Sequence, residues 1–429
     1  MTRPIALDVS HLAHRLRYGA PSGIEKVDLA YATHFSAESR IGAGVQYGIG
    51  RPRLMSPARV RALVASVRQK WASDSALADD ARFQRIRRWL TGADGDGPNL
   101  GHRDSPLKDM AAKSYTGLRR ALAPTIRPDR SALPHGAIYL NVAQHALEKH
   151  FYFSWLAKRP DVKAVFFVHD LLPLQEPQFW PADHLDIFRR RIACVTRHAS
   201  AIVTTSGNVE AALREAMKGA ARPDAPILAA PFPSPLALSA PAPAPGAELA
   251  DANYFVVVNT IEPRKNHRLL LDVWRELAKA GPRPPKLVMI GKRGWKYEEV
   301  TGPLLREPAL RARILEAAGL SDAGLRSLIA GANALLAPSF AEGYGLPIVE
   351  ALTLRTPVVA SEIPVFREVA QGRALFRDPG DVGGWVEAVK ALAQRDSPLA
   401  RSARQAANAY VPTTGEAYFA AIEAFLGSL

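Results

Sequence analysis

Short apolar runs alternate with segments of helical periodicity along most of the chain. Runs such as 254–258 are apolar throughout, as in strands that are buried on both faces. Between the runs, apolar residues recur every three or four positions, as in a helix with one buried face. Strands are predicted at 5–9, 137–141, 163–168, 201–206, 254–258, 287–290, 334–338, 358–360 and 375–379. Helices are predicted at 24–35, 188–199, 267–280, 347–354, 384–394 and 414–426. This alternation predicts an α/β fold with parallel sheets.

Residues 51–130 interrupt the alternation with two basic amphipathic stretches. Their apolar faces consist of Val60, Leu63, Val64, Val67 and Trp71 in the first stretch and Phe83, Ile86, Trp89 and Leu90 in the second. Basic amphipathic helices that carry tryptophan suit a membrane interface. They equally suit packing against a domain, with the arginine side chains extending to water. The sequence leaves both interpretations open.

The same segment carries much of the positive charge of the chain, whose formal net charge is +14. It holds 17 Lys and Arg residues against 8 Asp and no Glu, an excess of nine positive charges. Such an excess indicates an anionic partner, for example phospholipid, a polyanionic glycan, a nucleotide or nucleic acid. The alternative is a solvated, arginine-rich surface.

A stiff linker is predicted at 226–250, because this stretch is rich in proline and alanine and such a composition cannot build a packed core. With 429 residues, 48% of them hydrophobic, the chain is long enough for two globular domains. We predict an N-terminal domain at 1–225 that includes the basic helical insertion at about 51–130. A C-terminal domain is predicted at 251–410.

The cysteine content and the apolar stretches bear on the location of the protein. Cys194 is the single cysteine, so no disulfide can form within the chain, which agrees with a reducing compartment. No stretch approaches the ~20 apolar residues that span a bilayer, and the N-terminus lacks the apolar core of a signal peptide. We expect a cytoplasmic protein, and the basic segment leaves open a peripheral contact with the inner face of the cytoplasmic membrane.

The stretch 334–364 predicts a strand, a glycine-containing loop, a helix and a second strand. Glu342 lies in the loop and Glu350 in the helix, with seven residues between them. Ligands bind at the carboxyl edge of parallel strands, and the free N–H groups of a helix start suit phosphate. A phosphorylated ligand would then lie at the helix start with one acid near each end. Alternatively, the two glutamates only stabilise the helix N-terminus.

Two further strand ends carry candidate chemistry. Arg264 and Lys265 follow the predicted strand 254–258, beside a helix start. Arginine presents a fork of donors and lysine a point charge, so the pair suits a diphosphate. His169 follows the strand 163–168 at the same kind of edge. The alternatives are a solvated basic pair and a structural histidine.

SFAEGYGLPIVEAL, residues 339–352, resembles the E-x7-E motif of the retaining glycosyltransferases of family 4. The resemblance implies that Glu342 contacts the transferred sugar and acts in catalysis, and that Glu350 binds the ribose of the nucleotide. It also implies that the backbone of the loop faces the diphosphate or the sugar. The loop residues concerned are Gly343, Tyr344, Gly345 and Leu346.

TIEPRKN, residues 260–266, resembles the donor-domain motif of the same family and implies that Arg264 and Lys265 neutralise the leaving diphosphate. HDLLPL, which begins at His169, resembles the HDxxPL stretch of bacterial members and implies that this histidine faces the transferred sugar. In the first strand–loop–helix unit, Gly23 would face the diphosphate, whereas Lys26 is expected to be a solvated side chain.

Additional contacts are predicted at other strand ends. Donor binding is expected from Asn259, Thr260, Gly291 and Ser339, and acceptor binding from Asp170, Asn141 and His145. Asp170 would orient the imidazole of His169 or bind a hydroxyl. No DxD-type motif stands out at a strand end, and two cations already serve the diphosphate, so we expect a metal-independent reaction without a cofactor.

The resemblance implies the GT-B fold, in which two Rossmann-like domains face each other across a cleft. It is strong over 250–395, moderate over 135–215 and absent over 51–130. The C-terminal domain would bind most of the nucleotide-diphosphate sugar. The C-terminal helix within 411–429 would cross back to the N-terminal domain.

The motifs are similar to those of bacterial mannosyl- and rhamnosyltransferases that build surface polysaccharide. This implies a retaining transfer of a sugar, with GDP-mannose as the expected donor, to a glycan or lipid-linked glycan, as in lipopolysaccharide synthesis. No nucleic-acid partner is expected. Two alternatives remain: a nucleotide-sugar epimerase or hydrolase on the same fold, and a non-catalytic protein that binds polyanions or membranes.

Overall fold

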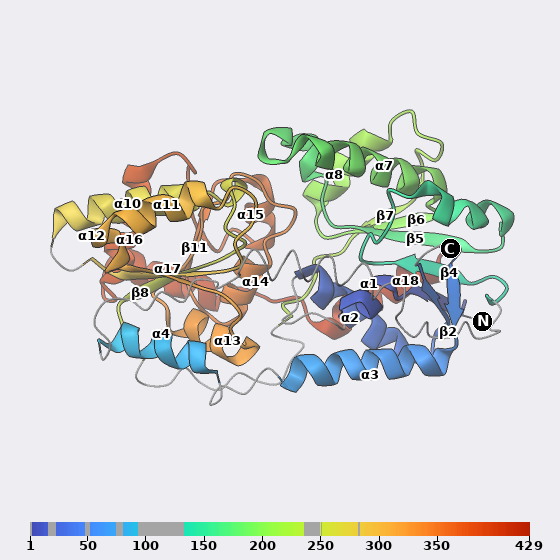
Figure 1. Ribbon diagram of the computed structural model, residues 1–429, viewed down its shortest axis with the longest axis horizontal. Coiled ribbons are helices and arrows are strands. Elements are labelled where there is room, and N and C mark those ends of the chain that lie inside the picture. Colours follow the sequence, from blue (N-terminus) through green and yellow to red (C-terminus); the bar gives the residue numbers. More distant parts are fainter. Residues whose placement is uncertain are drawn as a thin grey trace.

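The computed structural model describes residues 2–15, 23–47, 52–73, 80–92, 133–235, 249, 251–281 and 284–429. They form two α/β domains that lie side by side (Figure 1), each built around one sheet. Most of the predicted linker at 226–250 and much of the segment 51–130 lie outside the described residues.

The sheet of the first domain has seven strands within the described residues, in the order β3-β2-β1-β4-β5-β6-β7. Neighbouring strands are parallel except for the antiparallel pair of β2 and β3. The strands are β1 (Ile5–Asp8), β2 (Ile41–Gln46), β3 (Arg53–Met55), β4 (Ile138–Asn141), β5 (Lys163–Val168), β6 (Ala201–Thr204) and β7 (Ile227–Ala229). The first part of the chain also contains α1 (Ser10–Arg15), α2 (Gly23–Ala37), α3 (Pro57–Ser73), α4 (Ala81–Thr91), η1 (His150–Lys158), α6 (Leu172–Gln175), η2 (Pro177–Phe179), α7 (Ala182–His198) and α8 (Gly207–Met217).

The sheet of the second domain is entirely parallel, with six strands in the order β10-β9-β8-β11-β12-β13. The strands are β8 (Tyr254–Val258), β9 (Lys286–Ile290), β10 (Ile314–Ala317), β11 (Leu335–Ala337), β12 (Val358–Ser361) and β13 (Leu375–Arg377). The helices are η3 (Pro263–Lys265), α10 (His267–Ala280), α11 (Glu298–Arg306), α12 (Pro308–Arg311), α13 (Asp322–Gly331), α14 (Leu346–Thr353), α15 (Pro364–Val369), α16 (Val382–Ala393), α17 (Pro398–Asn408) and α18 (Gly415–Gly427). Strand order reverses between β8 and β11, so their carboxyl ends form a topological switch point.

Every strand and helix predicted from the hydrophobic pattern is present, with shifts of a few residues at the ends. The pattern missed the strands β2, β3, β7 and β10 and several helices, including α1, α6, α11, α12, α13, α15 and α17. The predicted linker therefore begins too early, because β7 pairs with β6 inside the first sheet. Because proline and alanine dominate the composition of this segment, the three residues of β7 do not stand out in the sequence as a strand.

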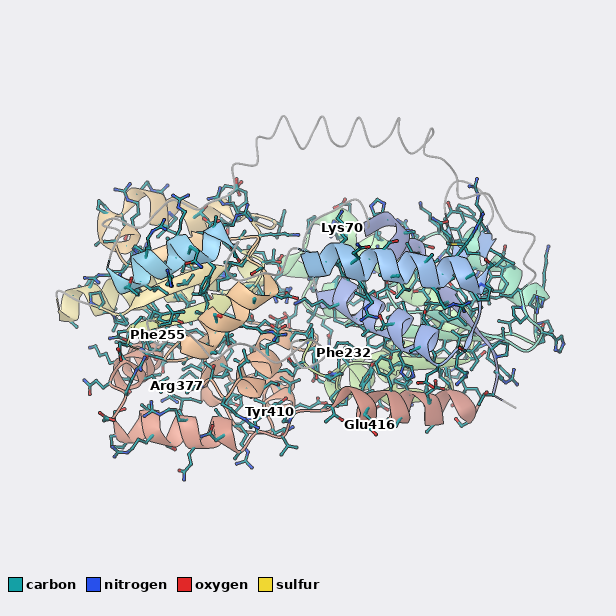
Figure 2. The ribbon with its side chains drawn as sticks, turned by 90° about the horizontal axis from the view of Figure 1, so that it is seen from below. Lys70, Phe232, Phe255, Arg377, Tyr410 and Glu416 are labelled. Atoms are coloured by element: carbon teal, nitrogen blue, oxygen red, sulfur yellow. The ribbon has the colours of Figure 1, made fainter. Side chains whose placement is uncertain are left out.

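Helix α4 packs on the second domain, although it lies among N-terminal residues in the sequence. The Arg82 guanidinium donates to the carbonyl oxygens of Ala318 and Gly319, both at 2.8 Å. Lys286 of β9 donates to the carbonyl of Trp89 and lies 4.8 Å from the centroid of its indole ring. Figures 1 and 2 show α4 beside the second sheet and α3 beside the first. The assignment of the whole insertion to the N-terminal domain was therefore wrong for α4.

Helix α3 packs on α2 and β2 of the first domain. Val60 fits against Gly44, where an added Cβ would lie 2.5 Å from a Val60 methyl carbon. The apolar faces of both basic helices are buried, so each one contacts its own domain and is not open to lipid. None of the helices in the described ranges is long and apolar enough to cross a membrane.

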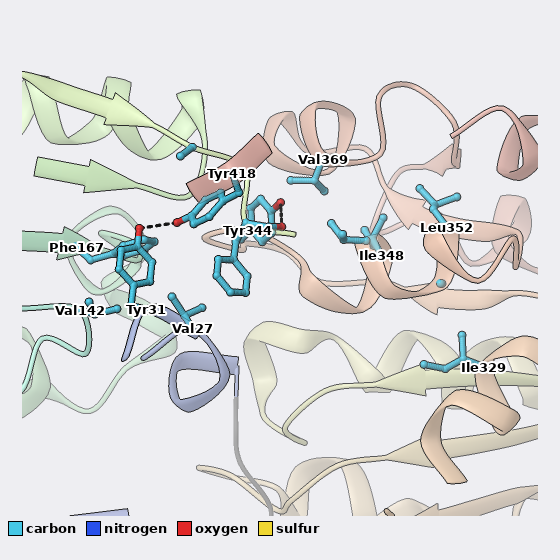
Figure 3. Packing of buried hydrophobic residues seen from close by; sticks show 14 of the residues in the cluster. Val27, Tyr31, Val142, Phe167, Ile329, Tyr344, Ile348, Leu352, Val369 and Tyr418 are labelled. Carbon is cyan, nitrogen blue, oxygen red and sulfur yellow. Dashed lines mark hydrogen bonds between the residues drawn. The ribbon is translucent and has the colours of Figure 1, made fainter. Parts of the chain in front are cut away.

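Helix α18 carries the end of the chain back to the first domain. In Figure 2, α17 and α18 follow one another along the two domains, with Tyr410 between them and Glu416 at the start of α18. The hydroxyls of Tyr418 in α18 and Tyr31 in α2 are 2.7 Å apart. The ring of Phe419 stacks on His34 at 4.1 Å. Figure 3 shows the buried cluster around Tyr31 and Tyr418 continuing through Tyr344 into the second domain.

The docking of α4 can be tested at Asp80, whose carboxylate has two uses. One oxygen accepts from the N–H groups of Arg82 and Phe83 at the start of α4, and the other accepts from the N–H of Ser321 at 2.7 Å. Asp80→Ala should lower the free energy of unfolding by about 1–2 kcal/mol, because it removes an N-cap. Asp80→Asn retains the cap oxygen and should cost less. Urea unfolding measures both, and an Asp80→Ala protein as stable as wild type would contradict this docking.

Candidate active site

The candidate site begins at the switch point of the second sheet, where β8 and β11 end. Beyond β8 the chain runs through Asn259 and Thr260 to η3, which carries Arg264 and Lys265. Gly291 follows β9 so closely that a Cβ there would lie 1.7 Å from the carbonyl oxygen of Asn259. Only glycine fits at this position, and its lack of a side chain lets the two strand ends approach.

Glu342 joins the segments that follow β8 and β11. One carboxylate oxygen accepts from Arg264 at 3.0 Å, and the other accepts from Lys265 and, at 2.8 Å, from the Ser339 hydroxyl. Arg264 also donates to the carbonyl of Ala341 at 2.8 Å and to Glu262 at 2.7 Å. The structure thus brings together the two predicted cations and the first predicted acid. The pairing of the acid with both cations was not predicted.

The charges at this cluster follow from its burial. Burial disfavours the ionised carboxylate of Glu342, but Lys265 and Arg264 outweigh that effect and hold its pKa at about 2. Burial lowers the pKa of Lys265, an effect that Arg264 reinforces and Glu342 opposes. The cluster is therefore a compact set of ionised groups held away from water, where each charge interacts strongly with its neighbours.

The glycine loop between Glu342 and α14 meets the first domain directly. A Cβ at Gly343 would lie 2.5 Å from the Asp170 Cβ and 2.9 Å from the His169 carbonyl oxygen. The Thr205 hydroxyl lies 3.2 Å from the His169 carbonyl oxygen and 3.3 Å from that of Gly343. Gly345 precedes α14 with φ of +111°, a conformation that glycine adopts without strain. Thr205 was not named among the site residues, although it lies at the end of the predicted strand 201–206.

Two loop side chains point away from the strand ends. The Tyr344 hydroxyl donates to the carbonyl of Phe232 at 2.7 Å, within the buried cluster shown in Figure 3. Leu346 packs against Gly23, where an added Cβ would lie 2.9 Å from a Leu346 methyl carbon. The side chain of Tyr344 is therefore not placed for donor binding, and only its backbone could serve a ligand.

Glu350 is buried in the first turns of α14 and faces the first domain. Lys26 of α2 lies 3.9 Å from it and 3.2 Å from Asp322, the first residue of α13. The expectation that Lys26 is solvated was wrong, because its side chain is 16% exposed and placed between two carboxylates. Sequence reasoning missed Asp322 as well, and no local pattern indicates either contact.

His169 is oriented by the backbone and not by its neighbour Asp170. Its Nε2–H donates to the carbonyl of Val142 at 2.8 Å, while an Asp170 oxygen accepts from the N–H of Leu172 at 3.1 Å. Burial lowers the pKa of His169 to about 4, so the ring is neutral at physiological pH. Burial raises the pKa of Asp170. The hypothesis that Asp170 orients the imidazole is thus contradicted.

Of the expected acceptor residues, Asn141 is engaged in the core of the first domain. Its amide donates to Asp8 at 2.7 Å, and Tyr139 donates to the same oxygen at 2.8 Å. Asn141 is 1% exposed, so its side chain supports Asp8 and is not available to an acceptor. His145 lies 6.4 Å from His11, ring centroid to centroid, and burial lowers its pKa.

Two aromatic residues that follow α6 extend the site across the domain boundary. The ring of Phe179 stacks on that of Phe340 at 5.7 Å, and the Arg264 guanidinium lies 5.6 Å from the Trp180 ring. Sequence reasoning missed this pair, and the adjacent aromatic residues after the HDLLPL stretch were the available signal. Among the residues that the structure describes, no group of three or more His, Cys, Asp and Glu side chains is arranged to hold a metal ion.

Parts of the chain are similar to known glycosyltransferases. The profile of the family described as glycosyl transferases group 1 matches residues 243–410. The chain is 30% identical over 250 residues to the serotype-specific mannosyltransferase WbdA of Escherichia coli, covering 54% of this chain and 30% of that protein. It is 36% identical over 135 residues to the O-antigen chain mannosyltransferase B of Escherichia coli, covering 32% of this chain and 35% of that protein. The matches thus span about a third of the length of these relatives.

Two solved structures are similar to this chain over most of its length. The crystal structure of Anabaena Alr3699/HepE in complex with UDP matches over 100% of both chains, with a TM-score of 0.58 and 16% sequence identity. Sucrose-phosphate synthase from Thermosynechococcus elongatus matches over 76% of this chain and 78% of that one, with a TM-score of 0.53 and 17% identity. The predicted GT-B architecture of two Rossmann-like domains is confirmed.

The buried His169 predicts a pH dependence of stability. Its pKa is about 4 in the folded protein against 6.5 when exposed, so the unfolded chain binds a proton first as the pH falls. The stabilising effect of the neutral ring is complete above pH 6.5 and is lost toward pH 4, by at most about 1.4 kcal/mol per pH unit. His169→Gln, which can still donate to Val142, should weaken this dependence in thermal unfolding at pH 4–7.

His267 offers a matched comparison, because burial lowers its pKa to about 3 and it lies on α10, apart from the domain boundary. His267→Gln should likewise weaken the loss of stability below pH 6.5, and the double variant should weaken it further. A His169→Gln protein that loses stability with the same pH profile as wild type would contradict the neutral, buried ring.

Proposed function

We propose that the chain, whose residues 243–410 match the model of the glycosyl transferases group 1, is a retaining glycosyltransferase of family 4 that transfers a sugar from a nucleotide-diphosphate donor to a glycan acceptor. The observation that carries the proposal is the cluster of Glu342, Arg264 and Lys265 at the switch point, beside the start of α14. Cations and helix N–H groups suit a leaving diphosphate, and a carboxylate suits sugar hydroxyls.

The charges of the cluster suit a reaction in which a glycosidic phosphate bond breaks. Negative charge then develops on the diphosphate and positive charge on the sugar ring. Lys265 and Arg264 would stabilise the first, and Glu342 would position the sugar through its hydroxyls. Since Glu342 pairs with both cations but balances only one of their two charges, an arriving diphosphate would share them with it. The two cations supply the role that a metal ion fills elsewhere, so we propose metal-independent transfer.

His169 and Gly343 would complete the site at the domain boundary. The neutral imidazole, fixed by Val142, is suited to hydrogen bonding with a sugar hydroxyl and not to ion pairing. The direct contact between Gly343 and the first domain would exclude water from the sugar and favour transfer over hydrolysis.

We further propose mannose as the sugar, GDP-mannose as the donor and a surface polysaccharide, lipid-linked or not, as the acceptor. Support comes from the names of two relatives, a serotype-specific mannosyltransferase and an O-antigen chain mannosyltransferase. The reaction would take place at the cytoplasmic face of the membrane, where the exposed arginines on α3 would lie near anionic headgroups.

A donor screen tests the function. GDP, UDP, dTDP and ADP, with their common sugars, are compared by thermal shift on wild type and on Glu350→Gln. A ligand at about 100 times its dissociation constant adds roughly 2.7 kcal/mol of stability. One nucleotide class should stabilise the wild type, and Glu350→Gln should reduce that effect. Incubation of the matching donor with mannan or lipopolysaccharide fragments should yield an α-linked product, whereas free sugar or an epimer alone would contradict transfer.

The role of the basic pair is tested at Lys265. Lys265→Met should lower kcat by about 100- to 1,000-fold, or ~2.7–4 kcal/mol, because it removes charge stabilisation of the leaving diphosphate. The matched control is Arg293→Met, which removes a cation paired with Glu316 at 2.7 Å on the neighbouring strand ends. Steady-state kinetics measure kcat for both variants. Equal losses of kcat in Lys265→Met and Arg293→Met would refute a specific role for Lys265.

A further inference from the structure

Lys26 is a residue of the first domain that stands among charged groups of the second. Its ammonium nitrogen lies 3.2 Å from Asp322 and 3.9 Å from Glu350. The Glu350 side chain is 6% exposed and that of Lys26 16%, so both are largely removed from water, while Asp322 is 42% exposed. Lys26 therefore lies nearest to two acids, one of them the proposed ribose ligand.

The backbone holds this arrangement in place. Helix α2 begins at Gly23, which abuts Leu346 at the beginning of α14, so the two helix starts meet across the domain boundary. Lys26 and Glu350 each lie about one turn further along. Asp322 begins α13, and the N–H of the preceding Ser321 is bound to Asp80 of α4. The contact is built from ordered elements on both sides.

The charges that face Glu350 come from two helices. Burial raises the pKa of Glu350, and Asp322 of α13 adds to that effect, while Lys26 of α2 and Arg326 of α13 oppose it. Arg326 is on the same domain as Glu350 and accompanies it whether the domains are together or apart. Lys26 reaches Glu350 only when the two domains are together.

We propose that Lys26 is a positioning residue that keeps Glu350 charged and oriented to accept the ribose hydroxyls, so that approach of the first domain strengthens donor binding. The inference rests on the proposed function, in which Glu350 binds ribose. A carboxylate accepts hydrogen bonds from two neighbouring hydroxyls, whereas its protonated form gives up part of that capacity. A counterion from the opposite domain thus couples nucleotide affinity to domain closure.

The test measures the affinity of wild type and Lys26→Met for the nucleoside diphosphate found in the donor screen, by calorimetry between pH 5.5 and 8.5. Without Lys26 the pKa of Glu350 rises further. Protonation should then weaken binding at a higher pH than in wild type, by about tenfold for each unit of change in pKa. Affinities should converge toward pH 8.5. Lys26→Arg should restore the wild-type profile, and Lys279→Met, which removes an exposed lysine on α10, should not alter it.

The outcomes separate the alternatives. If the affinity of Lys26→Met equals that of wild type at every pH, the counterion role is overturned. A loss of affinity that is the same at every pH also overturns it and shows instead that Lys26 binds the diphosphate. In a Glu350→Gln background, Lys26→Met should have no further pH-dependent effect, as a double-mutant cycle requires for coupled residues. If wild type binds no nucleoside diphosphate while remaining folded, the proposed function fails and not only this inference.

Discussion

The neutralisation of Glu342 by Arg264 and Lys265 is the interaction on which the site depends. All three side chains are shielded from water. An unpaired charge in such a buried position costs several kcal/mol, so each of the three needs the others. The pairing ties the end of β8 to the loop after β11. It thereby sets the path of the loop, which passes Gly343 against the first domain and enters α14 at Gly345.

Contact between the domains relies on small residues and on backbone groups. Gly23 and Gly343 have no room for a Cβ, and this allows helix and loop to touch across the boundary. Hydroxyls of Thr205 and Ser206 donate to the Gly343 carbonyl, and Glu368 accepts from the backbone N–H groups that begin α8. These are polar contacts of modest strength, which suits domains that must admit a donor and release a product.

Helix α4 belongs to the N-terminal half of the chain but packs on the second domain. Its apolar face, with Trp89 at the centre, is buried against the second domain, and Asp80 and Arg82 anchor it to the start of α13. Helix α13 in turn presents Asp322 to Lys26. An element of the first part of the chain therefore supports the second domain at the place where the two domains meet. The basic faces of α3 and α4 remain outward, while their apolar faces serve packing.

The sequence by itself determined the alternation of strands and helices, the two-domain α/β architecture and the placement of Glu342, Arg264, Lys265 and His169 at strand ends. These follow from local periodicity and from motifs that span a few residues. Tertiary structure alone decided the pairing of Lys26 with Glu350 and Asp322, the docking of α4 on the second domain and the inward turn of the Tyr344 side chain. Such contacts join residues far apart in the chain, and burial fixes their partners and charges. Hydrophobic periodicity describes which face of an element is buried, but not which other element covers it.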